Sequence, residues 1–313
     1  MPLRLAIFGQ APIAKECIDR LLAAGHAIPV VYAPQDGSRP DALAAHARDL
    51  GLDVVQRRYF RKKGGMPIES ALAEYRSRDV DLNVLASFTS FLPGQITDAP
   101  EHKSICFHPS LLPLYRGGNA MQWQIIDGAL ETGVSIFVPD AGVDEGPVVV
   151  QKGGLEIGPQ DTTGSLFFKK LAPLAVEAIV EAVTRIDDGT ASPVVQDEST
   201  ATFQGLVTDA DAAIDLSRPA DVIDRLVRGC DPQPGAHLRL GDLRVRLYDV
   251  ALEAPLDAAP GTVTAIGDDG VVIAFVGGSL RVGRVRGDAG KEPASQFADR
   301  DGVSVGASFS SGE

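Results

Sequence analysis

The chain reads S-I-C-F-H-P-S-L-L-P-L-Y-R-G-G-N-A-M-Q-W at residues 104–123 and G-V-S-I-F-V-P-D-A-G-V-D-E-G-P at residues 133–147. Each segment runs from a short apolar stretch, typical of a buried β-strand, into a turn rich in Gly and Pro. The first turn begins at His108 and the second contains Asp144. We expect both turns at one edge of a sheet, where an imidazole and a carboxylate suit proton transfer during attack on a carbonyl.

The residues before these segments alternate between apolar runs and amphipathic stretches. The strand-like runs are residues 3–8, 28–32, 54–55 and 82–85. The helical stretches between them are residues 13–22, 41–50 and 70–75. Such alternation predicts an α/β fold, with a Rossmann-like parallel sheet that helices cover on both faces.

The pattern changes in the last third of the chain. Short alternating runs broken by Gly and Asp predict a small β-barrel there, and they are residues 236–240, 243–250, 261–266, 270–276 and 279–285. A stretch rich in Gly, Ser, Thr, Pro and Asp precedes this region and is typical of a linker. We therefore expect a catalytic domain at 1–188, a linker at 189–204 and a β-barrel domain at 205–313, with a frayed tail from residue 302.

The bulk composition excludes several classes of protein. The formal net charge of −13 argues against nucleic acid as a partner, because phosphate binding requires a basic surface. Two local groups of arginines are typical of a solvated sheet face, and they are Arg239, Arg244 and Arg246, and Arg281, Arg284 and Arg286. Three scattered cysteines fit neither a disulfide framework nor a zinc site, so we expect a cytoplasmic protein without structural metal. No apolar run approaches the ~20 residues that span a membrane.

Three residues of the quoted segments are candidates for catalysis. His108 precedes Pro109, so we expect it where a strand ends, although a histidine is more often structural when judged on residue type alone. Asp144 can orient this imidazole and exchange protons with it. Cys106 lies two residues before His108, on the same face of the expected strand. Its thiolate would suit uptake of an acyl group, but a small apolar residue filling space is the more common role of such a cysteine.

The segment H-P-S-L-L-P and the G-V-D-E-G loop at 142–146 resemble the folate-dependent formyltransferases, whose hallmark is N-x-H-[PG]-S-L-L-P followed by G-x-D-x-G. The likeness is greatest to the amino-terminal hydrolase domain of 10-formyltetrahydrofolate dehydrogenases and extends over almost the whole chain. Further matching motifs are I-F-G-Q at 7–10, L-N-V-L at 82–85, T-F-Q-G at 202–205 and P-A-S-Q-F at 293–297.

This resemblance implies roles for individual residues. His108 and Asp144 match the family's catalytic pair, whereas Cys106 stands where most members have an asparagine that donates to the oxyanion. In acyl transfer, one such hydrogen-bond donor stabilises the transition state by ~3–4 kcal/mol. The hydrolase domain of the 10-formyltetrahydrofolate dehydrogenases also lacks this asparagine. We expect His108 to donate in its place. The pterin is expected against Phe88, Phe91, Leu92, Pro139, Asp140, Ala141 and Val143. The acceptor side is expected at Ser110, Arg116, Gly117 and Asn119, with Arg116 as a ligand for an anionic group.

The resemblance implies 10-formyltetrahydrofolate as formyl donor and needs neither metal nor nicotinamide. We expect transfer to a small acceptor, which is an amine, a hydroxylamine or a carrier-bound thiol. Hydrolysis, with water as acceptor, remains an alternative, as does a folate-binding protein that has lost catalysis.

Overall fold

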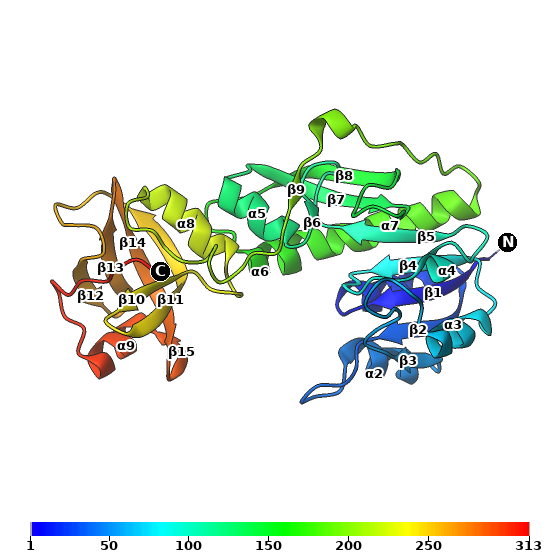
Figure 1. Cartoon of the computed structure of the whole chain (residues 1–313), viewed down its shortest axis with the longest axis horizontal. Helices are drawn as coiled ribbons and strands as arrows, with labels where there is room; N and C mark the ends of the chain where they lie inside the picture. Colours follow the sequence, from blue (N-terminus) through cyan, green and yellow to red (C-terminus); the bar gives the residue numbers. More distant parts are fainter. Residues whose placement is uncertain (1, 313) are drawn as a thin grey trace. The chain divides into compact units, whose positions relative to one another are not determined.

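The protein, described by a computed structural model over residues 2–312, forms two compact units whose elements are labelled in Figure 1. The N-terminal unit comprises residues 1–117, 132–155 and 168–203. The C-terminal unit comprises residues 118–131, 156–167 and 204–313. Two short segments before residue 188 thus group with the C-terminal unit. The domain bounds 1–188, 189–204 and 205–313 stay a prediction, which limited proteolysis would test.

A seven-stranded sheet forms the centre of the N-terminal unit, in the order β3-β2-β1-β4-β5-β7-β8. Its strands are β1 (Arg4–Gly9), β2 (Ala27–Ala33), β3 (Val54–Gln56), β4 (Leu82–Ala86), β5 (Ser104–His108), β7 (Glu131–Phe137) and β8 (Val148–Glu156). Neighbouring strands from β3 to β5 run parallel, whereas β7 runs antiparallel to β5. The predicted α/β fold is confirmed, and its sheet is mixed rather than wholly parallel.

Helices cover both faces of this sheet (Figure 1). They are α1 (Ile13–Ala23), α2 (Ala42–Asp49), α3 (Glu69–Arg76), α4 (Gly94–Thr97) and α7 (Ala172–Asp187). Helix α1 buries Ile13, Cys17 and Leu21, which are spaced four residues apart on one face, and it packs against α7. Helix α3 packs on the opposite face, beneath Phe8 of β1. Within residues 2–312, no helix has both the length and the apolarity needed to cross a bilayer.

Aromatic rings fill the core on the α3 side of the sheet. Phe8 stacks on Tyr32 with 4.2 Å between ring centroids, and it meets Phe60 and Phe88 edge-on at 5.6 and 5.5 Å. Phe60 and Phe88 lie in the loops that follow β3 and β4. The cluster therefore anchors both loops to the carboxyl ends of the parallel strands, where ligands of such sheets bind.

The C-terminal unit is built on an antiparallel sheet in the order β10-β11-β14-β13-β12, with β15 paired to β14. Its strands are β10 (His237–Leu240), β11 (Leu243–Glu253), β12 (Val263–Gly267), β13 (Gly270–Phe275), β14 (Gly278–Gly287) and β15 (Gly290–Pro293). Its helices are α5 (Ala120–Asp127), α6 (Thr163–Leu166), α8 (Ala220–Gly229) and α9 (Ala294–Asp301). The remaining short elements are β6 (Arg116–Gly117), which pairs with β9 (Phe203–Gln204), a π-helical turn at Phe167–Leu171 and a 3-10 turn at Glu198–Thr200. The prediction of a second domain built from short β-strands is confirmed, and the structure shows these strands as an antiparallel sheet.

The last residues close this sheet. Ser310 pairs with Arg239 of β10, and Ser308 pairs with Thr262 at the start of β12, so one segment bridges the two edges. The amide of Gly312 also donates to the carbonyl of Ile214. The expectation of a frayed tail is wrong for residues 302–312, because the exposed edges of a sheet are stabilised when another strand pairs with them.

The two arginine groups of this unit are partly neutralised. Asp209 pairs with both Arg244 and Arg246, and Arg281 pairs with Glu253 at 2.7 Å. These ion pairs agree with the prediction of a solvated sheet face.

Candidate active site

His108 ends strand β5 and is buried, with 5% of its surface exposed. Its Nε2 lies 2.8 Å from the carbonyl oxygen of Tyr115, and its Nδ1 lies 3.4 Å from Oδ2 of Asp144. A carbonyl oxygen only accepts a hydrogen bond, so Nε2 carries a hydrogen and Nδ1 is the nitrogen left for proton exchange. Burial lowers the pKa of His108, and Asp144 and the Tyr115 carbonyl offset this effect only in part. The imidazole is therefore neutral near pH 7.

Asp144 reaches His108 from the loop between β7 and β8. Strand β7 pairs with β5 in antiparallel register, with His108 opposite Ser135 and Cys106 opposite Phe137. The chain along β7 therefore runs toward the start of β5, away from the end where His108 lies. The expectation that both turns leave at the same sheet edge is wrong, because β7 is reversed. The loop instead turns back, and Gly146 permits this, since a Cβ there would lie 1.8 Å from the carbonyl oxygen of Val138.

Asp144 has a left-handed backbone, with φ of 58°, a conformation that costs energy for a residue other than glycine. Two hydrogen bonds hold it in this conformation. The amide of Gly117 donates to its Oδ2 at 2.8 Å, and Nε2 of Gln196 donates to its carbonyl oxygen at 2.8 Å. Gln196 also donates to the carbonyl of Gly146 at 2.7 Å, so one side chain fixes the loop at two points.

Arg116 in turn holds Gln196. Its guanidinium donates to Oε1 of Gln196 at 3.0 and 2.9 Å and to both carboxylate oxygens of Glu198 at 2.9 and 2.7 Å. The residue is buried, and these four bonds use the directions in which an arginine fork binds an anion. Its expected role as a ligand for an acceptor's charge stays a prediction, but its contacts favour a structural role.

Cys106 lies beside the aromatic cluster of the sheet. It packs against the apolar residues around Phe8, and its Sγ lies 3.7 Å from the carbonyl oxygen of Phe107. Burial and, to a smaller extent, the Asp144 carboxylate raise the pKa of the Cys106 thiol well above its ordinary value. The thiol is therefore protonated near pH 7, which favours the role of a small apolar residue over that of a nucleophile.

The residues expected to bind the pterin fall into two groups. Phe88 and Leu92 are half-buried against the aromatic cluster, whereas Phe91 is 60% exposed beneath the guanidinium of Arg61. The second group lies in the β7–β8 loop and is exposed or half-exposed; its members are Pro139, Asp140, Ala141 and Val143. In this turn Oδ1 of Asp140 accepts from the amide of Gly142. A half-buried apolar wall beside main-chain polar groups fits a flat heterocycle, so binding there stays a prediction with a compatible geometry.

The expected acceptor residues have structural contacts of their own. Ser110 is fully buried, and its hydroxyl donates to the carbonyl of Leu114 at 2.6 Å. Asn119 belongs to the C-terminal unit, where its Oδ1 accepts from the amide of Val207. Gly117 donates its amide to Oδ2 of Asp144 at 2.8 Å. Acceptor binding by these residues stays a prediction.

Sequence reasoning missed Gln196 and Glu198. Both lie in the segment 189–204 that its composition marks as a linker, and Gln196 is buried at 7% exposure. A polar stretch gives no periodic signal for such a contact. The T-F-Q-G match at the end of this segment was the available hint that the segment belongs to the fold of the family.

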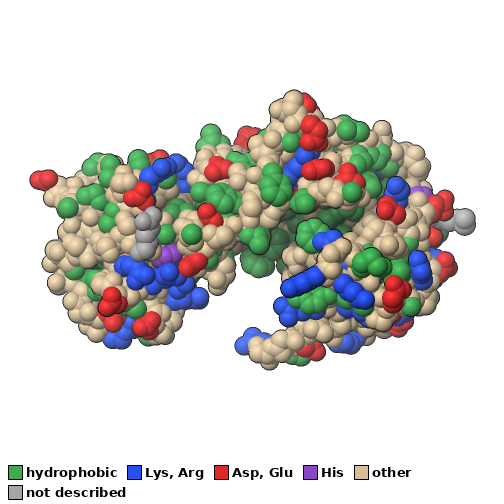
Figure 2. All heavy atoms as spheres, in the orientation of Figure 1, with side chains coloured by type: hydrophobic (Ala, Val, Ile, Leu, Met, Phe, Trp, Pro, Cys, Tyr) green, Lys and Arg blue, Asp and Glu red, His purple; other side chains and the backbone are tan. Residues whose placement is uncertain are grey.

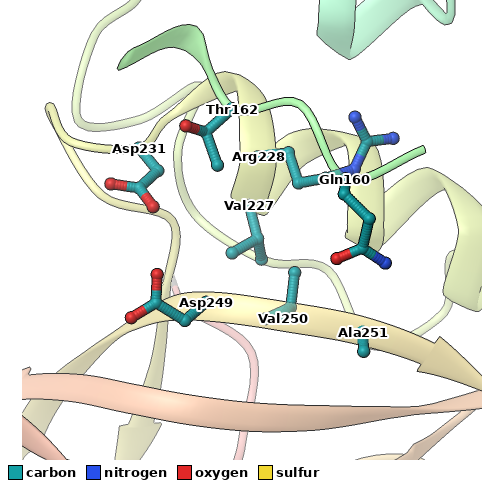
Figure 3. Close-up of a pocket in the computed structure, with 8 residues that line it drawn as sticks. All are labelled: Gln160, Thr162, Val227, Arg228, Asp231, Asp249, Val250 and Ala251. Carbon is teal, nitrogen blue, oxygen red and sulfur yellow. The ribbon is translucent and has the colours of Figure 1, made fainter. Parts of the chain in front are cut away.

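A separate hollow of about 230 Å³ lies within the C-terminal unit (Figure 3). The carboxylates of Asp231 and Asp249 face each other across it. Nζ of Lys291 lies 3.7 Å from Oδ1 of Asp231, and Arg228 forms an ion pair with Asp224. Much of the charge around this hollow is therefore already paired. None of the expected site residues lines this hollow.

The sequence and fold were compared with known proteins. Residues 3–183 match the formyl transferase family, and residues 206–301 match the formyl transferase C-terminal domain. The mouse mitochondrial 10-formyltetrahydrofolate dehydrogenase is 35% identical over 316 residues, which cover 97% of this chain and 34% of that protein. The methionyl-tRNA formyltransferase of Burkholderia multivorans is 33% identical over 323 residues, which cover 98% and 97%.

Two solved structures show the same fold at low sequence identity. HypX from Aquifex aeolicus in complex with tetrahydrofolic acid has a TM-score of 0.73 at 18% identity, over 97% of this chain and 48% of that one. An N-formyltransferase from Helicobacter canadensis with folinic acid and dTDP-3-aminofucose has a TM-score of 0.62 at 16% identity, over 90% and 98%.

The chain belongs to the formyl transferase family. It spans about a third of the length of the dehydrogenases that it matches.

Proposed function

We propose that this protein transfers the formyl group of 10-formyltetrahydrofolate to a small acceptor, with His108 and Asp144 as the catalytic pair. The observation that carries the proposal is the buried imidazole, which has a carbonyl at Nε2 and a carboxylate 3.4 Å from Nδ1. Relatives named as formyltransferases and as 10-formyltetrahydrofolate dehydrogenases support the donor. The half-buried wall of Phe88 and Leu92 is compatible with it.

The pair manages the proton that the reaction must move. The donor supplies an activated formyl carbon. The acceptor atom gains that carbon and loses a proton, and the folate nitrogen loses the carbon and gains a proton. Nδ1 of His108 takes up the acceptor's proton, and Asp144 and the Tyr115 carbonyl stabilise the resulting imidazolium from both sides. The same nitrogen then returns the proton to the leaving folate.

The stabilisation of the oxyanion is weaker here than in relatives that have the asparagine. Cys106 is a poor donor, and Nε2 of His108 is already bound to the carbonyl of Tyr115. Donation by His108 to the oxyanion therefore requires that this bond open. Main-chain amides of the same loops are the remaining donors.

Water is the second candidate acceptor. The sequence identity with the 10-formyltetrahydrofolate dehydrogenases, over 97% of this chain, favours hydrolysis to formate and tetrahydrofolate. Both reactions use the same pair, because an amine, a hydroxylamine, a thiol or water must each lose a proton during attack. A non-catalytic folate-binding protein would keep the wall of Phe88 and Leu92 without turnover.

The deciding experiment measures tetrahydrofolate release from 10-formyltetrahydrofolate in water alone, and then with amine, hydroxylamine and thiol acceptors. We expect acceptor-dependent release that His108→Ala abolishes and that His102→Ala, a matched change in a histidine outside the site, preserves. Release in water alone, lost in His108→Ala, would make the protein a hydrolase. Folate binding without release under any condition would refute the catalytic proposal.

A further inference from the structure

Three cations form a row across neighbouring strands of the C-terminal sheet. Arg246 of β11 lies opposite Arg286 of β14, which in turn lies opposite Lys291 of β15, and we call these three residues the basic row. Leu247 and Val285, their neighbours along the chain, belong to the apolar core, so the row lies on the other face of the sheet. Figure 2 shows Lys and Arg side chains gathered on this unit, where Figure 1 labels β10 and β11. Like charges directly opposite each other destabilise a sheet, so the row favours an anion near it.

The ends of the basic row have carboxylate partners, and its centre has none. Nη2 of Arg246 lies 3.7 Å from Oδ1 of Asp209, and Nζ of Lys291 lies 3.7 Å from Oδ1 of Asp231. Arg286 lies between these two cations, and no carboxylate of residues 2–312 forms an ion pair with it. The uncompensated charge of the row is therefore confined to its centre.

A buried hydroxyl adjoins this centre. Tyr248 lies two residues after Arg246 on the same face of β11, and its ring centroid is 3.9 Å from Nζ of Lys291 and 5.9 Å from Cζ of Arg286. The residue is fully buried, and its hydroxyl has no hydrogen-bond partner among residues 2–312. Burial raises the pKa of Tyr248, and Arg286 and Arg246 offset this effect only in part, so the hydroxyl keeps its proton. A buried donor without an acceptor is rare in a folded protein.

The turn before β10 packs closely on this hydroxyl. Gly235 has φ of 88°, and a Cβ there would lie 2.4 Å from the hydroxyl oxygen of Tyr248 and 2.9 Å from Cδ of Arg246. Only glycine fits this approach. The unpartnered hydroxyl and the basic row thus meet in one small region of the sheet face.

We propose that the centre of the basic row binds the phosphate group of a small molecule, with Arg286, Lys291 and the hydroxyl of Tyr248 as donors. The planar guanidinium of an arginine binds two phosphate oxygens at once. A further phosphate oxygen remains for the hydroxyl, whereas a carboxylate has only two oxygens in all. Arg286 and Lys291 are half-buried on long stems, so they can part to admit the anion to the hydroxyl. This site lies in the C-terminal unit and does not depend on the proposed function.

The carboxylates beside the row favour a small molecule over a nucleic acid. A chain of phosphates that continued along the row would meet Asp209 at one end or Asp231 at the other. The net charge of −13 on the whole chain also opposes a large polyanion. A single phosphate group needs only the centre of the row.

The test titrates the intact protein with inorganic phosphate, ribose 5-phosphate and acetate, followed by calorimetry and thermal unfolding. We expect saturable binding of the two phosphates, no binding of acetate, and weaker binding in about 0.5 M NaCl, because salt screens these charges. Tighter binding of ribose 5-phosphate than of inorganic phosphate would identify an organic phosphate as the source of the group. Equal affinities would identify free phosphate.

Two variants assign the binding to the row. Arg286→Gln should weaken phosphate binding roughly tenfold, because it removes charge-assisted hydrogen bonds. Arg218→Gln removes an exposed arginine beside Pro219, which pairs with Val276 just before β14 begins, and it should bind phosphate like the wild type.

Tyr248→Phe removes the hydroxyl alone. Its affinity for phosphate should fall roughly fivefold, the usual effect of one hydrogen bond. Without phosphate the variant should unfold at no lower temperature than the wild type, since the hydroxyl has no partner to lose. A hydroxyl with a purely structural role would give the opposite result, which is lower stability without phosphate and unchanged affinity.

Three further outcomes would overturn the proposal. Absence of saturable phosphate binding in the wild type would show that the row is only a solvated surface. Phosphate binding that survives Arg286→Gln would place the site elsewhere. Binding of a single-stranded oligonucleotide that depends on Arg286 and is tighter than that of either small phosphate would assign the row to nucleic acid.

Discussion

Gln196 donates its side-chain amide to the carbonyl oxygens of both Asp144 and Gly146, at 2.8 and 2.7 Å. Gln196 and Asp144 lie 52 positions apart in the sequence, and their contact fixes the left-handed turn that brings the carboxylate to His108. Gln196 itself touches neither nitrogen of the imidazole. It is therefore a positioning residue, and its removal should act on Asp144 rather than on substrate binding.

We expect Gln196→Ala to lower kcat more than it changes KM for the donor. The buried carbonyl of Gly146 and the half-buried carbonyl of Asp144 would lose their donor, which costs about 1–3 kcal/mol and lets the loop move. The measurement is steady-state kinetics together with thermal unfolding. The exposed Gln95→Ala in α4 serves as a control and should resemble the wild type in both. A rise in KM with unchanged kcat would show that Gln196 contacts substrate instead of positioning Asp144.

Arg116→Lys tests the two roles considered for that residue. A lysine cannot bind Gln196 and Glu198 with the planar fork that the guanidinium provides, so we expect lower thermal stability and a lower kcat. Glu198→Gln, which weakens the same contact from the other side, should cause a smaller change in the same direction. If Arg116 bound the charge of an acceptor, Arg116→Lys would instead raise KM for that acceptor and leave Glu198→Gln without effect.

The α/β fold and the proximity of His108 to Asp144 could be predicted because their signals are local. Apolar runs that alternate with amphipathic stretches predict strands and helices, and the H-P-S-L-L-P turn marks the end of β5. The direction of β7 could not be predicted, since a short apolar run is the same in a parallel and an antiparallel strand. The contacts of Gln196 and Arg116 could not be predicted either, because they join segments about 50 and 80 residues apart that carry no periodic pattern.

The closure of the C-terminal sheet escaped prediction for a similar reason. Residues 302–312 have the composition of a loose tail, yet Ser308 and Ser310 pair with two strand edges. Backbone hydrogen bonds make this pairing, so it leaves little trace in side-chain chemistry.

Cys106→Ala should retain kcat within about threefold, because the protonated thiol packs as a small apolar group and alanine leaves only a small gap. The raised pKa of the thiol also predicts slow alkylation by iodoacetamide at neutral pH. Mass spectrometry of the protein during turnover should find no formyl group on Cys106. A formyl thioester at this residue, together with loss of turnover in Cys106→Ala, would establish covalent catalysis instead.

The dependence of the rate on pH should report on His108. Burial lowers the pKa of its imidazole, so the neutral base persists below the ordinary value of about 6.5, and the rate should fall only as pH decreases through that lowered pKa. Asp144 raises this pKa, and Asp144→Asn should therefore move the acid limb to lower pH while reducing the maximal rate. The free energy of unfolding should also decrease at acid pH. The unfolded state binds a proton at His108 more readily than the folded state, so the protein loses stability as the pH falls below about 6.5. Rates measured from about pH 5 to 8 would check this, and an acid limb above about 6.5 that persists in His108→Ala would assign the titration to another group.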